Sequence, residues 1–150
     1  MSELRELYQT TILDHNRKPR NFRVPEDANR EADGYNPLCG DKVTVYLTVE
    51  DGVVRDVGFQ GSGCAISTAS ASLMTQAVKG RPMDEVLARF DEFHELVTSD
   101  PQEEPDLERV GKLAVFAGVR EFPMRVKCAT LAWHTLRSAI EGGAETAVTE

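Results

Sequence analysis

Hydrophobic and polar residues alternate most regularly between residues 43 and 59. Apolar side chains at positions 43, 45, 47 and 49 are separated by threonine and tyrosine, which is the period of a strand with one buried face. Asp51-Gly52 is a typical two-residue hairpin turn, and residues 53–59 return as a second strand. Residues 32–35 are a candidate for a third strand. We therefore expect a small antiparallel sheet.

The rest of the chain follows a helical period. Apolar residues spaced three and four apart predict helices over residues 3–14, from Cys64 to a stop at Lys79-Gly80, over 84–96, over 107–119, and from Cys128 to about 141. Pro123 is expected to break the chain before the last helix. The pattern predicts one α+β domain over residues 1–150, in which a small antiparallel three-stranded sheet packs against about five helices. Residues 142–150 are expected to be frayed.

Composition and charge narrow the functional classes. With 150 residues, 41% hydrophobic and 28% charged, the chain is typical of a globular protein. It contains no apolar run near the ~20 residues of a membrane span, and its charged start is unlike a signal peptide. We expect a soluble cytoplasmic protein with no membrane partner. The net charge of −8 argues against nucleic acid as a partner.

Acidic residues concentrate in one part of the sequence. Between Asp84 and Glu108 ten acidic residues accompany one basic residue, Arg89. The segment is interpreted as a solvated helical face and loop, with a docking surface for a partner as the alternative.

The three cysteines fall at predicted element boundaries. Cys39 lies in the turn "NPLCGD", Cys64 follows "GSG" at a strand-to-helix junction, and Cys128 stands where the last helix is expected to begin. An odd number of cysteines without a secretion signal favours metal binding or thiol chemistry over disulfides. A helix N-terminus stabilises a thiolate, which would apply to Cys64 and Cys128. Each cysteine taken singly is more typical of a small buried apolar residue, and it is the occurrence of three at element boundaries that favours a site.

A carboxylate joins these thiols in the sequence pattern. Asp41 follows Cys39 by two residues. Three thiolates and one carboxylate form a plausible tetrahedral zinc site, with Cys39, Asp41, Cys64 and Cys128 as ligands. The spacing differs from the paired ligands of a zinc finger, so the tertiary fold would have to gather the four.

Three motifs carry a resemblance to a known family. "NPLCGD", "GSGCAIS" and "RVKCATLAWHTL", with the opening "LYQTTILDHNRKPRN", resemble the IscU/NifU-type iron–sulfur cluster assembly proteins from about residue 3 to about 141. The scaffold branch of that family carries a histidine before its third cysteine, where this chain has Lys127, and the stretch from Gly80 to Cys128 is longer. Both features are similar to the SufU subgroup.

The resemblance implies a fold, a cofactor and a partner. It implies an IscU/SufE-like fold that binds zinc through Cys39, Asp41, Cys64 and Cys128. It implies that Cys39 accepts persulfide sulfur from a pyridoxal-phosphate cysteine desulfurase of the SufS type, so that the protein is at most a zinc-dependent sulfurtransferase. Downstream iron–sulfur scaffolds or apo-proteins would be further partners.

Other functions stay open on the sequence alone. The three cysteines could hold a transient [2Fe–2S] cluster with Asp41 easing its release, or the chain could be a structural zinc-binding interaction module. Arg125 and Lys127 either tune the third cysteine and steer a persulfide or are exposed cations. A cysteine hydrolase is disfavoured because His15, His94 and His134 are expected to be surface or half-buried helix residues.

Overall fold

Three long antiparallel strands form the centre of the sheet. The computed structural model describes residues 2–104, 106–142 and 147–148. Strand β1 covers Arg30–Asn36, β2 covers Asp41–Glu50 and β3 covers Val53–Ser62, paired in sequence order. Two short segments extend this sheet, β4 (Arg81–Pro82) beside β3 and β5 (Ala147–Val148) parallel to β1. The strand order is β4-β3-β2-β1-β5.

The hairpin between β2 and β3 confirms the predicted turn. Asp51 and Gly52 both have positive φ, 52° and 75°, as a type I′ turn requires. The predicted three-stranded sheet is confirmed as β1 to β3, with β4 and β5 as two-residue additions. Residues 142–150 are expected to be frayed, but Ala147–Val148 pairs with β1, so the expectation is wrong for these two residues. Residues 143–146 and 149–150 lie outside the described part.

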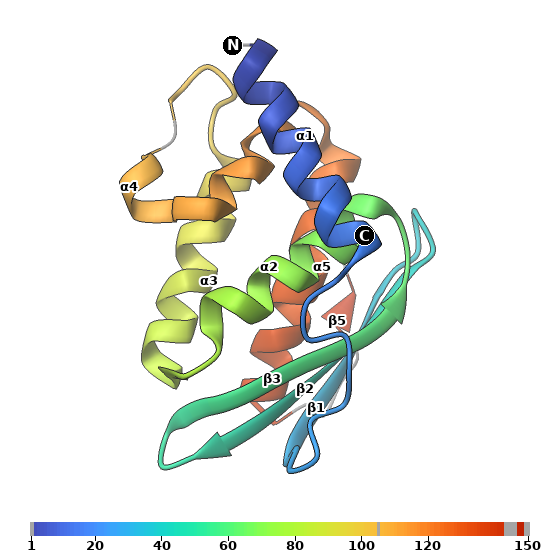
Figure 1. The fold of residues 1–150 in the computed structure, drawn as a ribbon, viewed down its shortest axis with the longest axis vertical. Coiled ribbons are helices and arrows are strands. Elements are labelled where there is room, and N and C mark those ends of the chain that lie inside the picture. Colours follow the sequence, from blue (N-terminus) through green and yellow to red (C-terminus); the bar gives the residue numbers. More distant parts are fainter. Residues whose placement is uncertain (1, 105, 143–146, 149–150) are drawn as a thin grey trace.

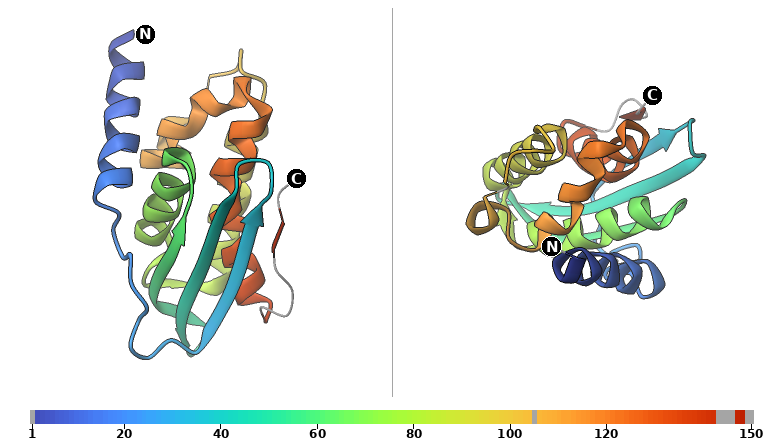
Figure 2. Two further views of the ribbon diagram at one scale, coloured as in Figure 1. Left: turned by 90° about the vertical axis from the view of Figure 1, so that its right-hand side faces the viewer. Right: turned by 90° about the horizontal axis from the view of Figure 1, so that it is seen from above.

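Helices cover one face of the sheet (Figures 1 and 2). Helices α2 and α5 contact the strands directly, α1 packs on the outer side of α2, and α3 packs against α5. The helical segments are α1 (Ser2–Arg17), α2 (Ala65–Val78), α3 (Met83–Thr98), α4 (Leu107–Val110), the 3₁₀ helix η1 (Gly111–Glu121) and α5 (Pro123–Ile140). Within the described residues, none of these helices has the length and apolar character needed to cross a bilayer.

The predicted type of one helix and the predicted start of another are wrong. The expected helix over residues 107–119 is an α-helix for only four residues and then a 3₁₀ helix. Gly111 has φ +56° at the junction, a left-handed conformation that an α-helix cannot continue through. The last helix begins at Pro123 and not at Cys128. Proline fits the first position of a helix because its missing N–H would have no intrahelical partner there, so Pro123 starts the helix instead of interrupting the chain.

The core lies between the sheet and the helices. Trp133 of α5 stacks on Phe93 of α3 with ring centroids 4.8 Å apart, and Phe116 meets Phe93 edge-on at 5.7 Å. Helix α2 presents serines to the interior, and the hydroxyl of the fully buried Ser70 donates to the carbonyl of Ala129 on α5. Small side chains on α2 therefore allow α5 to pack closely, and both helices carry a cysteine.

Candidate metal centre

The hairpin between β1 and β2 carries two of the predicted ligands. Its loop runs from Pro37 to Gly40, and Asn36 and Asp41 are paired across the strands that it joins. Gly40 has φ +70°, a conformation that glycine adopts without strain. Cys39 at the tip is exposed, whereas Asp41 points to the helix-covered face and is fully buried. One short loop therefore presents a thiol to solvent and a carboxylate to the interior.

Cys64 begins helix α2 and also contacts this hairpin. It is the N-cap of α2, and its Sγ accepts the N–H of Ser67 at 3.4 Å. Its own N–H donates to Oδ1 of Asp41 at 2.8 Å, and its Sγ lies 3.9 Å from Oδ2. The position confirms that Cys64 lies at a helix N-terminus, where the helix dipole favours a thiolate. The side-chain cap of this helix is the Cys64 sulfur.

Cys128 approaches the same point from helix α5. Because α5 begins at Pro123, Cys128 lies in the second turn, beyond the unpaired N–H groups of the first. The prediction that a helix N-terminus favours its thiolate is therefore wrong. Its side chain is only 3% exposed, and its Sγ lies 3.4 Å from Sγ of Cys39. Burial raises the pKa of the Cys128 thiol far above its ordinary value, and Cys39, Asp41 and Cys64 raise this pKa further.

The donor atoms of Cys39, Asp41 and Cys128 have mutual spacings that suit one metal ion, and Cys64 approaches this group through its contact with Asp41. Ligand atoms of Cys39, Asp41 and Cys128 all lie within 4.8 Å of one another. Around a tetrahedral zinc, two thiolate sulfurs would be about 3.8 Å apart, and a sulfur and a carboxylate oxygen about 3.6 Å apart. The Cys39–Cys128 sulfur separation of 3.4 Å and the separation of 3.9 Å from Cys64 Sγ to Asp41 Oδ2 are close to these values. Such a set of acidic donors fits a divalent cation, which would lower the pKa of the Cys128 thiol that burial raises.

The geometry also shows a residue that the sequence interpretation missed. Asn36 is completely buried, and its Nδ2 lies 3.3 Å from Oδ2 of Asp41 and 3.6 Å from Sγ of Cys128. Its Oδ1 accepts the N–H of Leu38 at 3.3 Å. The local signal was its place at the start of "NPLCGD", but its inward orientation depends on the strand pairing with Asp41.

The histidines contribute to the helix packing. His15 is buried, which contradicts the expectation of a surface or half-buried position, and its Nδ1 lies 2.7 Å from Oγ of Ser72. Burial lowers the pKa of His15, and the nearby Arg20 lowers it further. His94 and His134 contact each other and Phe90 between α3 and α5.

The two cations beside the third cysteine differ in their surroundings. The guanidinium of Arg125 lies over the ring of Phe122, 4.5 Å from its centroid. Lys127, immediately before Cys128, is half-buried. The Arg125 contact shows a packing role, and an effect of either cation on the thiol chemistry stays a prediction.

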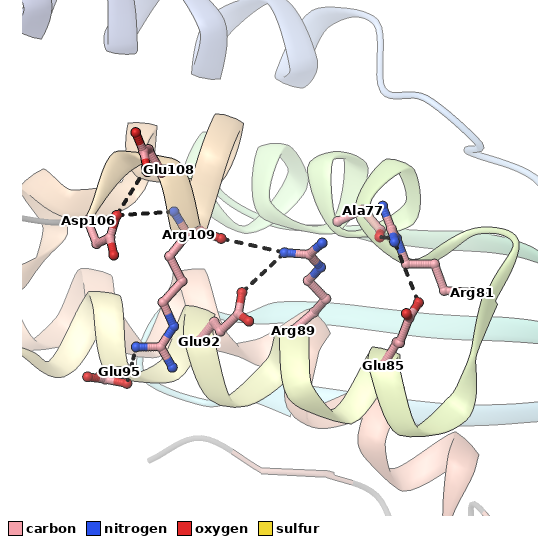
Figure 3. A network of polar contacts seen from close by, with 9 residues as sticks. All are labelled: Ala77, Arg81, Glu85, Arg89, Glu92, Glu95, Asp106, Glu108 and Arg109. Carbon is pink, nitrogen blue, oxygen red and sulfur yellow. Dashed lines mark hydrogen bonds and ion pairs between the residues drawn. The ribbon is translucent and has the colours of Figure 1, made fainter.

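Part of the acidic segment takes part in ion pairs within α3 and between α3 and the neighbouring elements β4 and α4 (Figure 3). Glu85 pairs with Arg81, Glu92 with Arg89, and Glu95 of α3 with Arg109 of α4. Oδ1 of Asp106 accepts the backbone N–H groups of Glu108 and Arg109. These contacts favour the interpretation as a solvated, internally paired face over a docking surface.

The candidate metal centre lies at one end of the sheet. The tip of the β1–β2 hairpin, the junction of β3 with α2 and the first turns of α5 come together there (Figures 1 and 2). Fold and donor set together define an α+β protein with a thiol-rich candidate metal centre, which lies where its strands and helices begin or end.

Comparison with known proteins places this class in a family. The family described as NifU-like N terminal domain matches residues 7–141. The iron-sulfur cluster assembly scaffold protein IscU of Streptococcus pyogenes serotype M1 is 39% identical over 144 residues, covering 96% of this chain and 89% of that protein. The zinc-dependent sulfurtransferase SufU of Bacillus subtilis (strain 168) is 38% identical over 145 residues, covering 95% and 97%. The crystal structure of FiSufU from Fervidobacterium islandicum AW-1 matches with a TM-score of 0.78 and 33% identity, covering 87% and 93%.

These matches include all three segments that carry a cysteine, namely the β1–β2 hairpin, the start of α2 and helix α5. The chain belongs to the NifU-like N-terminal domain family, and thereby to the iron–sulfur cluster assembly proteins of the IscU/SufU type. The resemblance seen in the sequence motifs is thus confirmed over most of the chain.

Proposed function

We propose that this protein binds zinc through Cys39, Asp41, Cys64 and Cys128 and accepts persulfide sulfur at Cys39 for iron–sulfur cluster biogenesis. One observation carries the proposal. An exposed thiol, Cys39, lies 3.4 Å from the buried thiol of Cys128, next to a buried carboxylate. Similarity to a protein named zinc-dependent sulfurtransferase supports zinc as the metal.

Zinc bound to these residues would keep the thiols ionised. Asp41 and Cys128 are buried and reach the centre from β2 and α5, so they would form its fixed part. Cys64 would be held through its N-cap position on α2. Cys39 differs from the other two cysteines because it lies on an exposed loop, and the loop position makes it the thiol that a partner can reach.

The proposed transfer step conserves electrons. The thiolate of Cys39 attacks the terminal sulfur of a persulfide on the donor cysteine. A sulfur–sulfur bond to Cys39 forms, the bond to the donor cysteine breaks, and the donor sulfur leaves as a thiolate that takes a proton from solvent. The persulfide now resides on Cys39, and the step needs no external oxidant or reductant.

Exposed apolar residues in the segments that carry Cys39 and Cys128 support a protein as the sulfur donor. Leu38 precedes Cys39 and is 51% exposed, and Met124 is 54% exposed one helical turn before Cys128. Phe122 is also exposed, with Arg125 over its ring. Apolar side chains around a nucleophile suit a protein that docks and excludes water during the transfer. We infer that this partner is a pyridoxal-phosphate cysteine desulfurase of the SufS type, with an iron–sulfur scaffold or apo-proteins as later acceptors.

The test uses Cys39→Ala beside a matched control. The zinc-loaded variant should fold normally but neither stimulate desulfurase turnover nor gain the mass of a sulfur atom when desulfurase and cysteine are supplied. Gln60→Ala, an exposed position at the end of β3, should behave as wild type. Persulfide formation on Cys39→Ala at the wild-type rate would contradict the assignment of Cys39.

A second candidate function rests on the same three thiols. Cys39, Cys64 and Cys128 could hold a transient [2Fe–2S] cluster, since such clusters prefer cysteine ligation, and IscU of Streptococcus pyogenes is named a scaffold protein. Anaerobic reconstitution with iron and sulfide, followed by transfer to an apo-acceptor, distinguishes a cluster scaffold from a zinc-dependent sulfur acceptor. A cluster chromophore that is passed on supports the scaffold function, and retention of zinc alone excludes it.

A further inference from the structure

Asn36 connects three of the segments that make up the centre. It is the last residue of β1 and is 0% exposed. Its Nδ2 faces Oδ2 of Asp41 on β2 at 3.3 Å and Sγ of Cys128 on α5 at 3.6 Å. Its Oδ1 accepts the N–H of Leu38, the residue before Cys39, at 3.3 Å. A single neutral amide therefore contacts two proposed ligands and the loop of a third.

The surrounding hydrogen bonds fix the orientation of this amide. The N–H of Leu38 is a donor only, so the atom of Asn36 that faces it must be the carbonyl oxygen. The NH₂ group is then directed at the carboxylate and the sulfur. Both of these groups accept hydrogen bonds best when they are ionised, and ionised is the form in which each binds a metal.

The two oxygens of Asp41 have different partners. Oδ1 takes the N–H of Cys64 at 2.8 Å, and Oδ2 takes Nδ2 of Asn36 at the longer distance of 3.3 Å. Oδ2 also lies 3.9 Å from the Cys64 sulfur. The backbone thus holds one oxygen in place, and Asn36 sets the direction of the other, which faces the sulfurs.

We propose that Asn36 is a positioning residue of the metal centre, which orients Asp41 and Cys128 as ligands by directing its N–H groups at the carboxylate and the sulfur. The inference rests on the proposed metal function of these residues. Outer hydrogen-bond partners of metal ligands characteristically contribute about 10- to 100-fold to metal affinity. Because Asn36 is neutral, it provides this donation without adding charge to a buried site.

A purely structural role for Asn36 makes a different prediction. As a buried amide that only satisfies the N–H of Leu38, it would affect the stability of the metal-free fold and leave the bound metal unchanged. As a positioning residue, it must alter the metal itself, because it donates to a ligand sulfur. A hydrogen bond to a thiolate lowers the energy of the sulfur lone pairs, so its loss should move the thiolate-to-cobalt charge-transfer band of a cobalt-substituted centre to lower energy.

The experiment compares Asn36→Ala and Asn36→Asp with Asn29→Ala. Asn29 is an exposed asparagine whose side chain bonds the backbone N–H and carbonyl of Val49, so it is a matched control. Zinc affinity, measured by competition with a chromophoric chelator, should fall about 10- to 100-fold in Asn36→Ala. It should fall further in Asn36→Asp, because a second carboxylate would face Asp41. The charge-transfer band should shift in both Asn36 variants and not in Asn29→Ala.

A measurement on the wild-type chain decides the matter even if the variants fold poorly. In the ¹¹³Cd-loaded protein, a scalar coupling between the Asn36 side-chain amide proton and cadmium, transmitted through the Cys128 sulfur, is expected. Absence of this coupling, or wild-type zinc affinity with an unshifted band in folded Asn36→Ala, would overturn the inference. Persulfide acceptance is measured in parallel: wild-type protein that binds zinc but takes no sulfur refutes the proposed sulfur transfer alone, whereas normal sulfur acceptance with unaltered metal binding in Asn36→Ala refutes the role of Asn36 alone.

Discussion

Gly63 offers a sharp test of Asp41 as a ligand, because it lies where a side chain would displace the carboxylate. A Cβ built on Gly63 would overlap Oδ1 of Asp41 and lie 3.0 Å from its Cγ. The φ of Gly63 is outside the left-handed region, so the backbone itself accepts alanine. The substitution Gly63→Ala therefore acts through the Asp41 carboxylate, which has to move.

The size of the effect follows from the bond that is lost. Moving the carboxylate breaks the 2.8 Å hydrogen bond from the Cys64 N–H to Oδ1. Hydrogen bonds to charged groups contribute about 1.5–3 kcal/mol, and each 1.4 kcal/mol corresponds to a tenfold change in an equilibrium constant. If Asp41 is a metal ligand held by this bond, zinc affinity should fall about 10- to 150-fold.

Zinc affinity is measured by chelator competition, and folding is checked by circular dichroism and thermal unfolding. Gly118→Ala serves as the control, because a Cβ there meets no atom within 4 Å and φ is again unstrained. The control should bind zinc as wild type does. Wild-type zinc affinity in a folded Gly63→Ala variant would refute the reasoning that Asp41, in the position seen here, ligates the metal.

Two further predictions concern the stability of the fold. Gly34→Ala should lower the free energy of unfolding by about 1–3 kcal/mol, since its Cβ would overlap Oγ1 of Thr135 on α5. In urea titrations a Thr135→Ala background should remove part of that loss, and an additive double mutant would contradict the clash. Burial lowers the pKa values of His15 and His134 below 6.5 in the folded state, so the unfolded chain binds protons first as pH falls. The contribution of these two histidines to the free energy of unfolding should be level in pH above about 6.5 and should decrease as pH falls below it. His15→Gln should reduce this slope, and an unchanged slope would show that His15 does not contribute.

Turns, helix ends and the buried face of a strand are predicted well from the sequence, because each depends on a few neighbouring residues. Asp51-Gly52 specifies the β2–β3 hairpin because both residues tolerate positive φ. Gly80, at φ +82°, follows the end of α2 as predicted. The alternation in β2 gives its buried face, with Val43, Val45 and Leu47 all in the core.

Features that depend on tertiary packing are not visible in the local pattern. Gly111 looks like one more residue of an amphipathic helix, but its positive φ changes the helix type. His15 is a polar residue in the last turn of α1, where the sequence pattern predicts an exposed or half-buried side chain, yet it is buried against Ser72 of α2. The inward direction of Asn36 follows from its pairing with Asp41.

The candidate site divides in the same way. The sequence pattern predicts Cys39, Asp41, Cys64 and Cys128 as ligands; the structure brings donor atoms of Cys39, Asp41 and Cys128 within 4.8 Å of one another, and Cys64 contacts this group through Asp41. Their ligation of zinc stays a prediction. The chemical environment of Cys128 could not be predicted from the sequence, because it depends on α5 beginning one and a half turns earlier than the apolar pattern indicates.

The most direct test of the central proposal is to locate the transferred sulfur after a single turnover. Zinc-loaded wild-type protein is mixed with a SufS-type desulfurase and one equivalent of cysteine, its free thiols and persulfides are alkylated, and the peptides are analysed by mass spectrometry. The proposal predicts the mass of one additional sulfur atom on the peptide that contains Cys39. It predicts no additional sulfur on the peptides that contain Cys64 and Cys128. Sulfur found first on Cys64 or Cys128, or on none of the three, would contradict it.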